Sequence, residues 1–160
     1  MLDNNTSLTE NTSAEELEGE LDVEDTSIRS FLTFMSNGLT YGVDNSYVVE
    51  IVNDYSLRPL PMVPDYIRGI FNLRGEVIPV IDLRMRLGCY DSNASDCTLI
   101  LKNEHTTIGL IVDQVSQVLD INLRKTVPIP VENKQELTNR MISLEDGTVI
   151  LVLNFEALVA

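Results

Sequence analysis

Short apolar runs separated by turn residues fill the chain from Phe31 onward, and their spacing is what most restricts the fold. Residues 31–35 and 39–43 flank Ser36-Asn37-Gly38, a strong hairpin turn. Further strand-like runs cover residues 47–52, 67–73, 76–83, 98–102, 107–112, 115–119, 141–144 and 148–153, and a terminal helical turn covers 156–159. Roughly eight to ten short strands at intervals of roughly 8 to 12 residues predict an all-β sandwich or small barrels.

The run 67–83 predicts a second hairpin, with Arg74-Gly75 at its turn. Gly75 supplies the backbone freedom that the reversal needs. Arg74 must point out of the turn, because a guanidinium is not buried without a partner. Pro79 removes one donor from the strand ladder, which predicts a bulge or an edge position.

Charge is unevenly distributed along the chain, whose net charge is −14. Nine acidic residues and no basic residue precede Arg29, so residues 1–28 carry −9 and are predicted to form a disordered acidic tail. The rest, residues 29–160, carries −5 and is predicted to be the folded domain. An acidic chain without a basic stripe does not suit nucleic-acid binding, because phosphate neutralisation supplies most of that affinity.

Membrane and export signals are missing from the pattern. No apolar run reaches the roughly 18 residues of a membrane-spanning helix. The N-terminal stretch has neither the basic start nor the apolar centre of a secretory signal. The chain is therefore predicted to be cytoplasmic.

Catalytic and metal-binding patterns are also weak. There is no glycine-rich phosphate loop and no nucleophile elbow, and His105 stands alone at a predicted hairpin tip. Cys89 and Cys97 have no histidine near them in the sequence, and a reducing cytoplasm predicts that both are thiols. A metal site would need more ligands than these, so no metal or cofactor is predicted. Asp82 and Asp113 each end an apolar strand, where capping or pairing with an arginine is expected. A small β-barrel enzyme with an unrecognised site remains the competing hypothesis.

Five pieces of sequence, in order, resemble the CheW family of chemotaxis coupling proteins. They are Phe31-Leu32-Thr33-Phe34, Tyr41-Gly42-Val43-Asp44, Val48-Val49-Glu50-Ile51, the NLRG stretch Asn72-Leu73-Arg74-Gly75 followed by Pro79-Val80-Ile81-Asp82-Leu83-Arg84, and residues 109–118. The resemblance extends from about Phe31 to Val159, which leaves out only the acidic tail. An ordered set of this kind is far more specific than any single piece.

The resemblance implies a fold and partners. The family fold is two small five-stranded SH3-like β-barrels that share a hydrophobic core, here with an approximate division near residues 90–97. Family members are non-enzymatic adaptors that bind the cytoplasmic tip of methyl-accepting chemoreceptors and the regulatory domain of the CheA histidine kinase. They do not insert into the membrane but are recruited to its receptor arrays. The alternative is the same fold serving a chemosensory-like pathway that controls twitching or a second messenger.

The resemblance also nominates contact residues. For the receptor, it suggests an apolar trough between the lobes with two polar guides; the candidates are Val48, Glu50, Ile51, Arg74, Val112, Val115 and Val118. Two or three of the five apolar residues in this set are expected to be mainly core. Arg74 could anchor the receptor or brace its own turn, and the sequence leaves both open. For the kinase, the candidates are Leu60, Tyr66 and Arg68.

Overall fold

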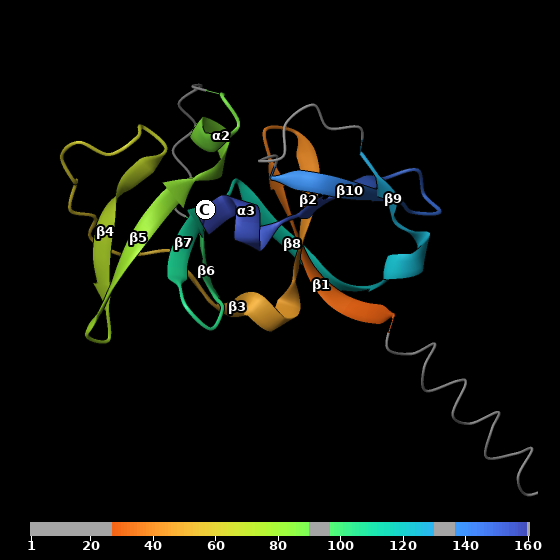
Figure 1. Cartoon of the computed structure of the whole chain (residues 1–160), viewed down its shortest axis with the longest axis horizontal. Helices are drawn as coiled ribbons and strands as arrows, with labels where there is room; N and C mark the ends of the chain where they lie inside the picture. Colours follow the sequence, from red (N-terminus) through yellow and green to blue (C-terminus); the bar gives the residue numbers. More distant parts are fainter. Residues whose placement is uncertain (1–26, 90–96, 130–136, 160) are drawn as a thin grey trace, which may run out of the picture.

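The computed structural model describes residues 27–89, 97–129 and 137–159, which form two β-sheets lying side by side (Figure 1). One sheet has six strands in the order β8-β1-β2-β11-β10-β9, namely β8 (Gln114–Asn122), β1 (Ile28–Ser36), β2 (Leu39–Asp44), β11 (Val149–Leu153), β10 (Thr138–Ser143) and β9 (Val127–Pro128). The other has five in the order β3-β6-β7-β5-β4, namely β3 (Val48–Val52), β6 (Thr98–Lys102), β7 (Thr107–Ile111), β5 (Glu76–Asp82) and β4 (Ile67–Leu73). The predicted all-β fold of two subdomains is confirmed.

In the part of the chain that the structure describes, four short helices join or end the strands. They are η1 (Asn45–Tyr47), α2 (Leu83–Arg86), η2 (Leu123–Lys125) and α3 (Phe155–Val159). Within the described residues, no helix has both the length and the apolar character needed to cross a bilayer.

The two sheets repeat one pairing pattern. In the six-stranded sheet, β1 and β2 form a hairpin, β2 pairs in parallel with β11, and β11 pairs with β10. In the five-stranded sheet, β4 and β5 form the hairpin, β5 pairs in parallel with β7, and β7 pairs with β6. The larger sheet exceeds the predicted five strands because β8 adds a strand beside β1.

Each sheet is closed by a segment that joins its opposite edges. In the six-stranded sheet, η2 leads from edge strand β8 toward edge strand β9. In the five-stranded sheet, the chain leaving β3 returns to the far edge, where Arg58 and Ile70 exchange backbone hydrogen bonds of 2.8 and 2.9 Å. Such partial closure covers part of the strand edges, as in small open β-barrels.

Successive side chains along a strand point alternately to the two faces of its sheet. One face packs within the same subdomain, and the other faces the space between the two sheets. On β6, Leu99 and Leu101 join the central cluster, whereas Ile100 packs inside the five-stranded sheet with Phe71. A strand buried on both faces contains a continuous apolar run, which explains residues 99–101.

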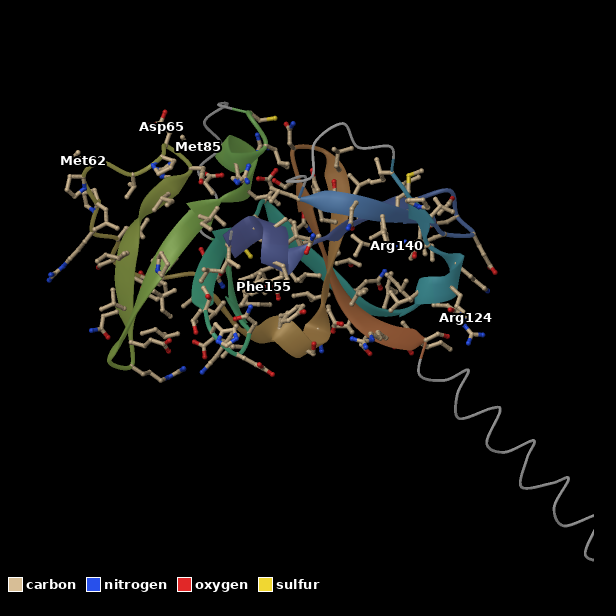
Figure 2. The ribbon with its side chains drawn as sticks, viewed as in Figure 1. Met62, Asp65, Met85, Arg124, Arg140 and Phe155 are labelled. Carbon is tan, nitrogen blue, oxygen red and sulfur yellow. The ribbon has the colours of Figure 1, made fainter. Side chains whose placement is uncertain are left out.

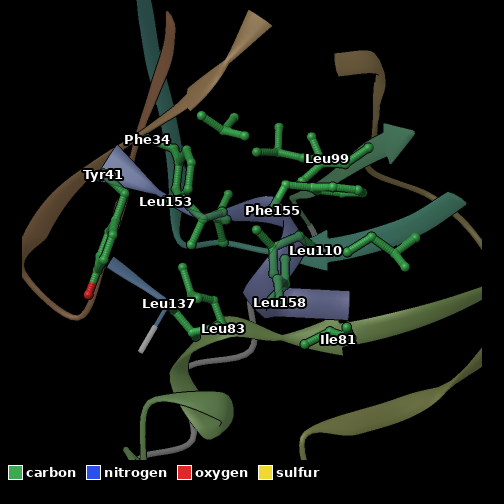
Figure 3. Packing of buried hydrophobic residues seen from close by; sticks show 14 of the residues in the cluster. Phe34, Tyr41, Ile81, Leu83, Leu99, Leu110, Leu137, Leu153, Phe155 and Leu158 are labelled. Atoms are coloured by element: carbon green, nitrogen blue, oxygen red, sulfur yellow. The ribbon is translucent and has the colours of Figure 1, made fainter. Parts of the chain in front are cut away.

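The central hydrophobic cluster draws on both sheets, so the predicted shared core is confirmed. Phe34 comes from the six-stranded sheet and Leu110 from the five-stranded sheet. Phe155 and Leu158 of α3 fill the space between them (Figures 2 and 3).

The chain crosses between the sheets twice, from β2 to β3 through η1 and from β7 to β8. The expected division near 90–97 falls largely on residues outside those described. Because β5 and β6, on either side of it, belong to the same sheet, the subdomains divide at the two crossings instead. Residues 1–26 of the predicted acidic tail also lie outside the described residues. The first strand, β1, begins at Ile28, one residue before the predicted start of the folded domain at residue 29.

Replacing Gly69 with alanine should open the five-stranded barrel. Gly69 has φ +145°, and a Cβ there would lie 2.4 Å from the carbonyl oxygen of Arg58, in the segment that closes the sheet. We expect Gly69→Ala to lower the free energy of unfolding by about 3 kcal/mol, because backbone atoms must move. Gly75→Ala is the matched control: its φ is +89°, but the space is open, so about 1 kcal/mol is expected. Equal losses in urea unfolding would contradict this account of closure.

Candidate functional site

The turn that joins β4 to β5 presents Arg74 to solvent. Arg74 and Gly75 have φ values of +50° and +89°, which is the backbone of a two-residue type I′ hairpin. The Asn72 side-chain oxygen accepts a hydrogen bond of 2.8 Å from the Gly75 amide and stabilises the reversal. The β1–β2 turn has the same form at Asn37-Gly38, with φ values of +52° and +78°. Asparagine is favoured at this position and arginine is not, so Arg74 occupies a backbone conformation that its side chain disfavours.

Glu50 on β3 holds the Arg74 guanidinium in place. The two guanidinium NH groups donate to the two carboxylate oxygens at 2.8 and 3.3 Å, and the Arg74 side chain is still 72% exposed. The hydrogen bond to Glu50 raises the pKa of Arg74 further above its ordinary value, at which the guanidinium is already charged. Bidentate pairing fixes the plane of the guanidinium and leaves its other N–H donors available.

A groove lined by both apolar and polar residues adjoins this turn. It has a volume of about 500 Å³, and its lining includes Val52, Tyr55, Leu73 and Val77. Tyr55 is fixed there by a hydroxyl contact of 2.6 Å with Thr98 and by packing on Phe71. A second hollow, of about 730 Å³ and lined mainly by polar and charged residues, lies beside the other end of β3.

The five apolar receptor candidates divide into core and surface. Val112 is 1% exposed within the central cluster, and Val48 and Val115 pack against that cluster. Ile51 and Val118 are 45% and 52% exposed. The expectation that two or three are mainly core therefore holds. Val112 supports the surface from below, because a side chain this buried cannot touch a partner.

Two of the three kinase candidates, Tyr66 and Arg68, lie at the end of the β4–β5 hairpin opposite its turn. Arg68 lies 3.7 Å from Asp82, and Tyr66 lies under the guanidinium of Arg86, 5.0 Å from its ring centre. Leu60 is exposed on the preceding loop. The loop is attached to the hairpin by the Asp82 amide, which donates to the Tyr66 carbonyl at 2.8 Å. We call the surface of Leu60, Met62, Tyr66 and Arg68 the loop end.

Asp113 joins the two sheets at the second crossing. Its carboxylate accepts two hydrogen bonds from Arg84 of α2, at 2.8 and 2.6 Å, and one from the Asn37 amide at 2.9 Å. The hydrogen bond from Arg84 lowers the pKa of Asp113. Asp82 caps α2 by accepting from the Arg84 amide at 3.0 Å. The predicted capping and pairing of these two aspartates is thus confirmed.

His105 lies in the connection after β6, and Cys89 and Cys97 lie in the connection before it. His105 is exposed at the β6–β7 turn, where its amide donates to Asn103 at 2.9 Å. Neither Cys89 nor Cys97 forms a disulfide, and the Cys89 sulfur accepts a hydrogen bond from the Asn37 side chain at 2.9 Å. Within the described ranges, no three His, Cys, Asp or Glu side chains are grouped as metal ligands would be.

Comparison with known proteins agrees with this architecture. The CheW-like domain family matches residues 30–160. This chain belongs to the CheW-like domain family. It is 30% identical over 132 residues to the chemotaxis protein CheW of Bacillus subtilis, covering 75% of this chain and 85% of that protein. It is also 34% identical over 97 residues to the chemotaxis protein CheW of Treponema pallidum, where the match spans 57% of each chain.

A solved CheW structure has the same fold. The crystal structure of the scaffolding protein TtCheW from Thermoanaerobacter tengcongensis superposes with a TM-score of 0.72 at 30% identity, covering 79% of this chain and 89% of that one. The predicted CheW resemblance is therefore confirmed.

Three features of this CheW-like domain escaped the sequence analysis. Tyr55 and Val77 line the groove beside Arg74, and the Met62 side chain is fully exposed at the loop end. Val77 alternates with the buried Ile78 and so could have been placed on the outer face of its strand. The partner of Arg74 could not be identified, because the return of β3 toward β4 depends on barrel closure.

Removing the Asp113 charge should weaken the junction between the sheets. We expect Asp113→Asn to lower the free energy of unfolding by about 2 kcal/mol at neutral pH, the scale of hydrogen bonds to a charged group. Because the folded pKa is depressed, this stabilisation is full above the unfolded value of about 3.9 and is lost as pH falls through the folded pKa. Urea unfolding of both proteins from pH 7 downward should show the difference shrinking below about pH 4. Asp65→Asn, on an exposed loop, is the control, and a difference independent of pH would contradict the assignment.

Proposed function

We propose that this chain is a non-enzymatic adaptor that couples chemoreceptors to a CheA-type histidine kinase in chemotaxis. The proposal is supported by membership of the CheW-like domain family and by relatives named as chemotaxis and scaffolding proteins. In this proposal the protein is cytoplasmic and is recruited to receptor arrays at the membrane.

The observation that carries the proposal is the exposed Arg74–Glu50 pair. An arginine in a disfavoured backbone conformation, fixed by one carboxylate and still largely exposed, is a preorganised donor. Glu50 accepts hydrogen bonds from two NH groups of the Arg74 guanidinium. The remaining N–H donors of Arg74 are left for an acceptor on a partner. We therefore favour Arg74 as an interface anchor that Glu50 positions, over a brace that acts only within the turn.

The receptor tip is a helical hairpin, and a helix docks by placing apolar side chains in a groove with polar groups at the rim. The groove of about 500 Å³ beside Arg74 has this composition, with Val52, Tyr55 and Val77 as walls. Ile51 is also exposed, but because side chains alternate along β3 it lies on the face opposite Glu50 and Val52 and outside this groove. Val118 lies on the other sheet, so its part in the same contact requires a receptor that spans both subdomains.

The loop end is the proposed kinase contact. It combines exposed apolar side chains with Arg68 and Arg86, and arginine and apolar residues are both favoured at interface centres. It lies at the other end of the β4–β5 hairpin from Arg74, so both partners can bind at once.

Arg74→Asn should separate folding from receptor binding. Asparagine suits the positive φ at this turn position, as Asn37 shows in the β1–β2 turn, so the unfolding midpoint should stay the same or rise. Loss of the guanidinium should weaken binding to a chemoreceptor cytoplasmic fragment by about tenfold or more, measured by calorimetry. Binding to the kinase regulatory domain should be unchanged. Native receptor affinity in a folded Arg74→Asn protein would refute the anchor.

A charge swap distinguishes an anchor from a brace. Glu50→Arg with Arg74→Glu reverses the pair but keeps opposite charges at the two positions. If the pair acts as an internal brace, the double variant should recover receptor binding that each single variant loses. We expect no recovery, because the partner would then meet a carboxylate where it needs a donor.

A further inference from the structure

Met62 is unusual both in the exposure of its side chain and in its backbone conformation. Its side chain is 103% exposed, the largest value among the exposed large hydrophobic residues, and its φ is +60°. A left-handed backbone is unfavourable for a residue with a long side chain, and a fully exposed apolar side chain gains nothing from folding.

The other non-glycine residues with positive φ have visible reasons for it. Among the described residues these are Asn37 and Arg74. Asn37 is a favoured residue type in a type I′ turn. Arg74 is held by Glu50. Met62 receives no such compensation from the fold, because its side chain is entirely in solvent. Uncompensated departures of this kind are typical of functional positions.

The loop holds Met62 outward. Pro59, Pro61 and Pro64 each restrict the backbone around it. The Ile67 amide donates to the Pro64 carbonyl at 3.0 Å, which fixes the exit of the loop on β4. Figure 2 shows Met62 projecting at the same end of the molecule as Asp65 and Met85. A restrained loop keeps the Met62 thioether accessible. Such a loop also loses little conformational entropy when a partner binds over the thioether.

The thioether is also the most accessible to oxidants among the described methionines. Met35, Met85 and Met141 are each partly buried. The Met85 sulfur in addition lies 3.7 Å from an NH group of Arg68, which can donate to the sulfur lone pair and reduce its nucleophilicity. Oxidation of Met62 turns an apolar flexible side chain into a polar one.

We propose that Met62 is a methionine-oxidation site that switches the loop end from a kinase-binding to a non-binding form. This inference rests on the proposed kinase contact. A peroxide transfers one oxygen atom to the Met62 sulfur, giving the sulfoxide; the sulfur is oxidised by two electrons and the other peroxide oxygen leaves as water or alcohol. The polar sulfoxide is disfavoured in the apolar pocket of the partner that received the thioether. A thiol-dependent sulfoxide reductase would restore the contact.

The first test measures where oxidation occurs. The full-length protein is treated with limiting hydrogen peroxide, and methionine-containing peptides are followed by mass spectrometry. Met62 should be oxidised about tenfold faster than Met35, Met85 and Met141, in keeping with its exposure. Similar rates at all four would overturn the site.

The second test measures the consequence. Binding to a CheA-type regulatory domain is measured by calorimetry before and after peroxide treatment, for the native protein and for Met62→Leu. Because residue 62 lies in the proposed contact, each protein is compared with its own untreated form, and any effect of the leucine on affinity is contained in that reference. Treatment should weaken native binding by about tenfold or more and leave Met62→Leu unchanged, and sulfoxide reductase should restore the native protein.

Each other result has a distinct meaning. If treated Met62→Leu also loses binding, the responsible residue is another one, such as a cysteine, and the switch is overturned. If Met62 is oxidised and native binding persists, the switch is again overturned. If the untreated protein does not bind the kinase domain while it still binds the receptor fragment, the kinase part of the proposed function fails, whatever the oxidation rates show.

Discussion

The hydrophobic cluster between the two sheets is the feature on which the rest of the structure depends. Neither sheet closes over its own apolar residues completely, because strands such as β6 carry buried side chains on both faces. Phe155 and Leu158 complete the packing from the last helix, and the Arg84–Asp113 pair fixes the sheets at the chain crossing. The subdomains are therefore one cooperative unit, and the proposed contact surfaces are held at a fixed mutual position.

Two residues with unfavourable backbone conformations are exposed to solvent. Arg74 and Met62 both have positive φ and both are exposed, at opposite ends of one hairpin. Glu50 stabilises the first within the chain, whereas the second depends on a partner. The difference explains why Arg74 is suited to permanent presentation of a donor, and why the apolar contact of Met62 is open to chemical control.

Local features of the fold followed from the sequence, and long-range pairings did not. The hairpins around Asn37-Gly38 and Arg74-Gly75 form as predicted, because turn chemistry and strand patterning are short-range. The parallel pairs β2–β11 and β5–β7 join segments that are distant in the sequence. The apolar pattern of one strand does not identify the strand with which it pairs. Pro79 was predicted to mark a bulge or an edge position, and although β5 lies between two strands, Pro79 itself pairs on one side only, with Ile70 of β4. It is tolerated because β7 pairs only from Val80 onward. The exposure of Arg74 was predictable for the same local reasons, but its pairing with Glu50 required barrel closure.

The β4–β5 hairpin gives the proposed adaptor a direct physical link between its partners. Arg74 lies at its turn, and Arg68, Tyr66 and Asp82 lie at its open end. Each strand has seven residues, which corresponds to a separation of about 20 Å at the usual rise per residue. Two hydrogen-bonded strands, closed on one side by β7 and on the other by the Arg58 bridge, resist bending. A receptor bound at the turn and a kinase bound at the loop end would therefore be held at a set distance and orientation. A movement of one would be transmitted to the other without any change of conformation in the adaptor itself.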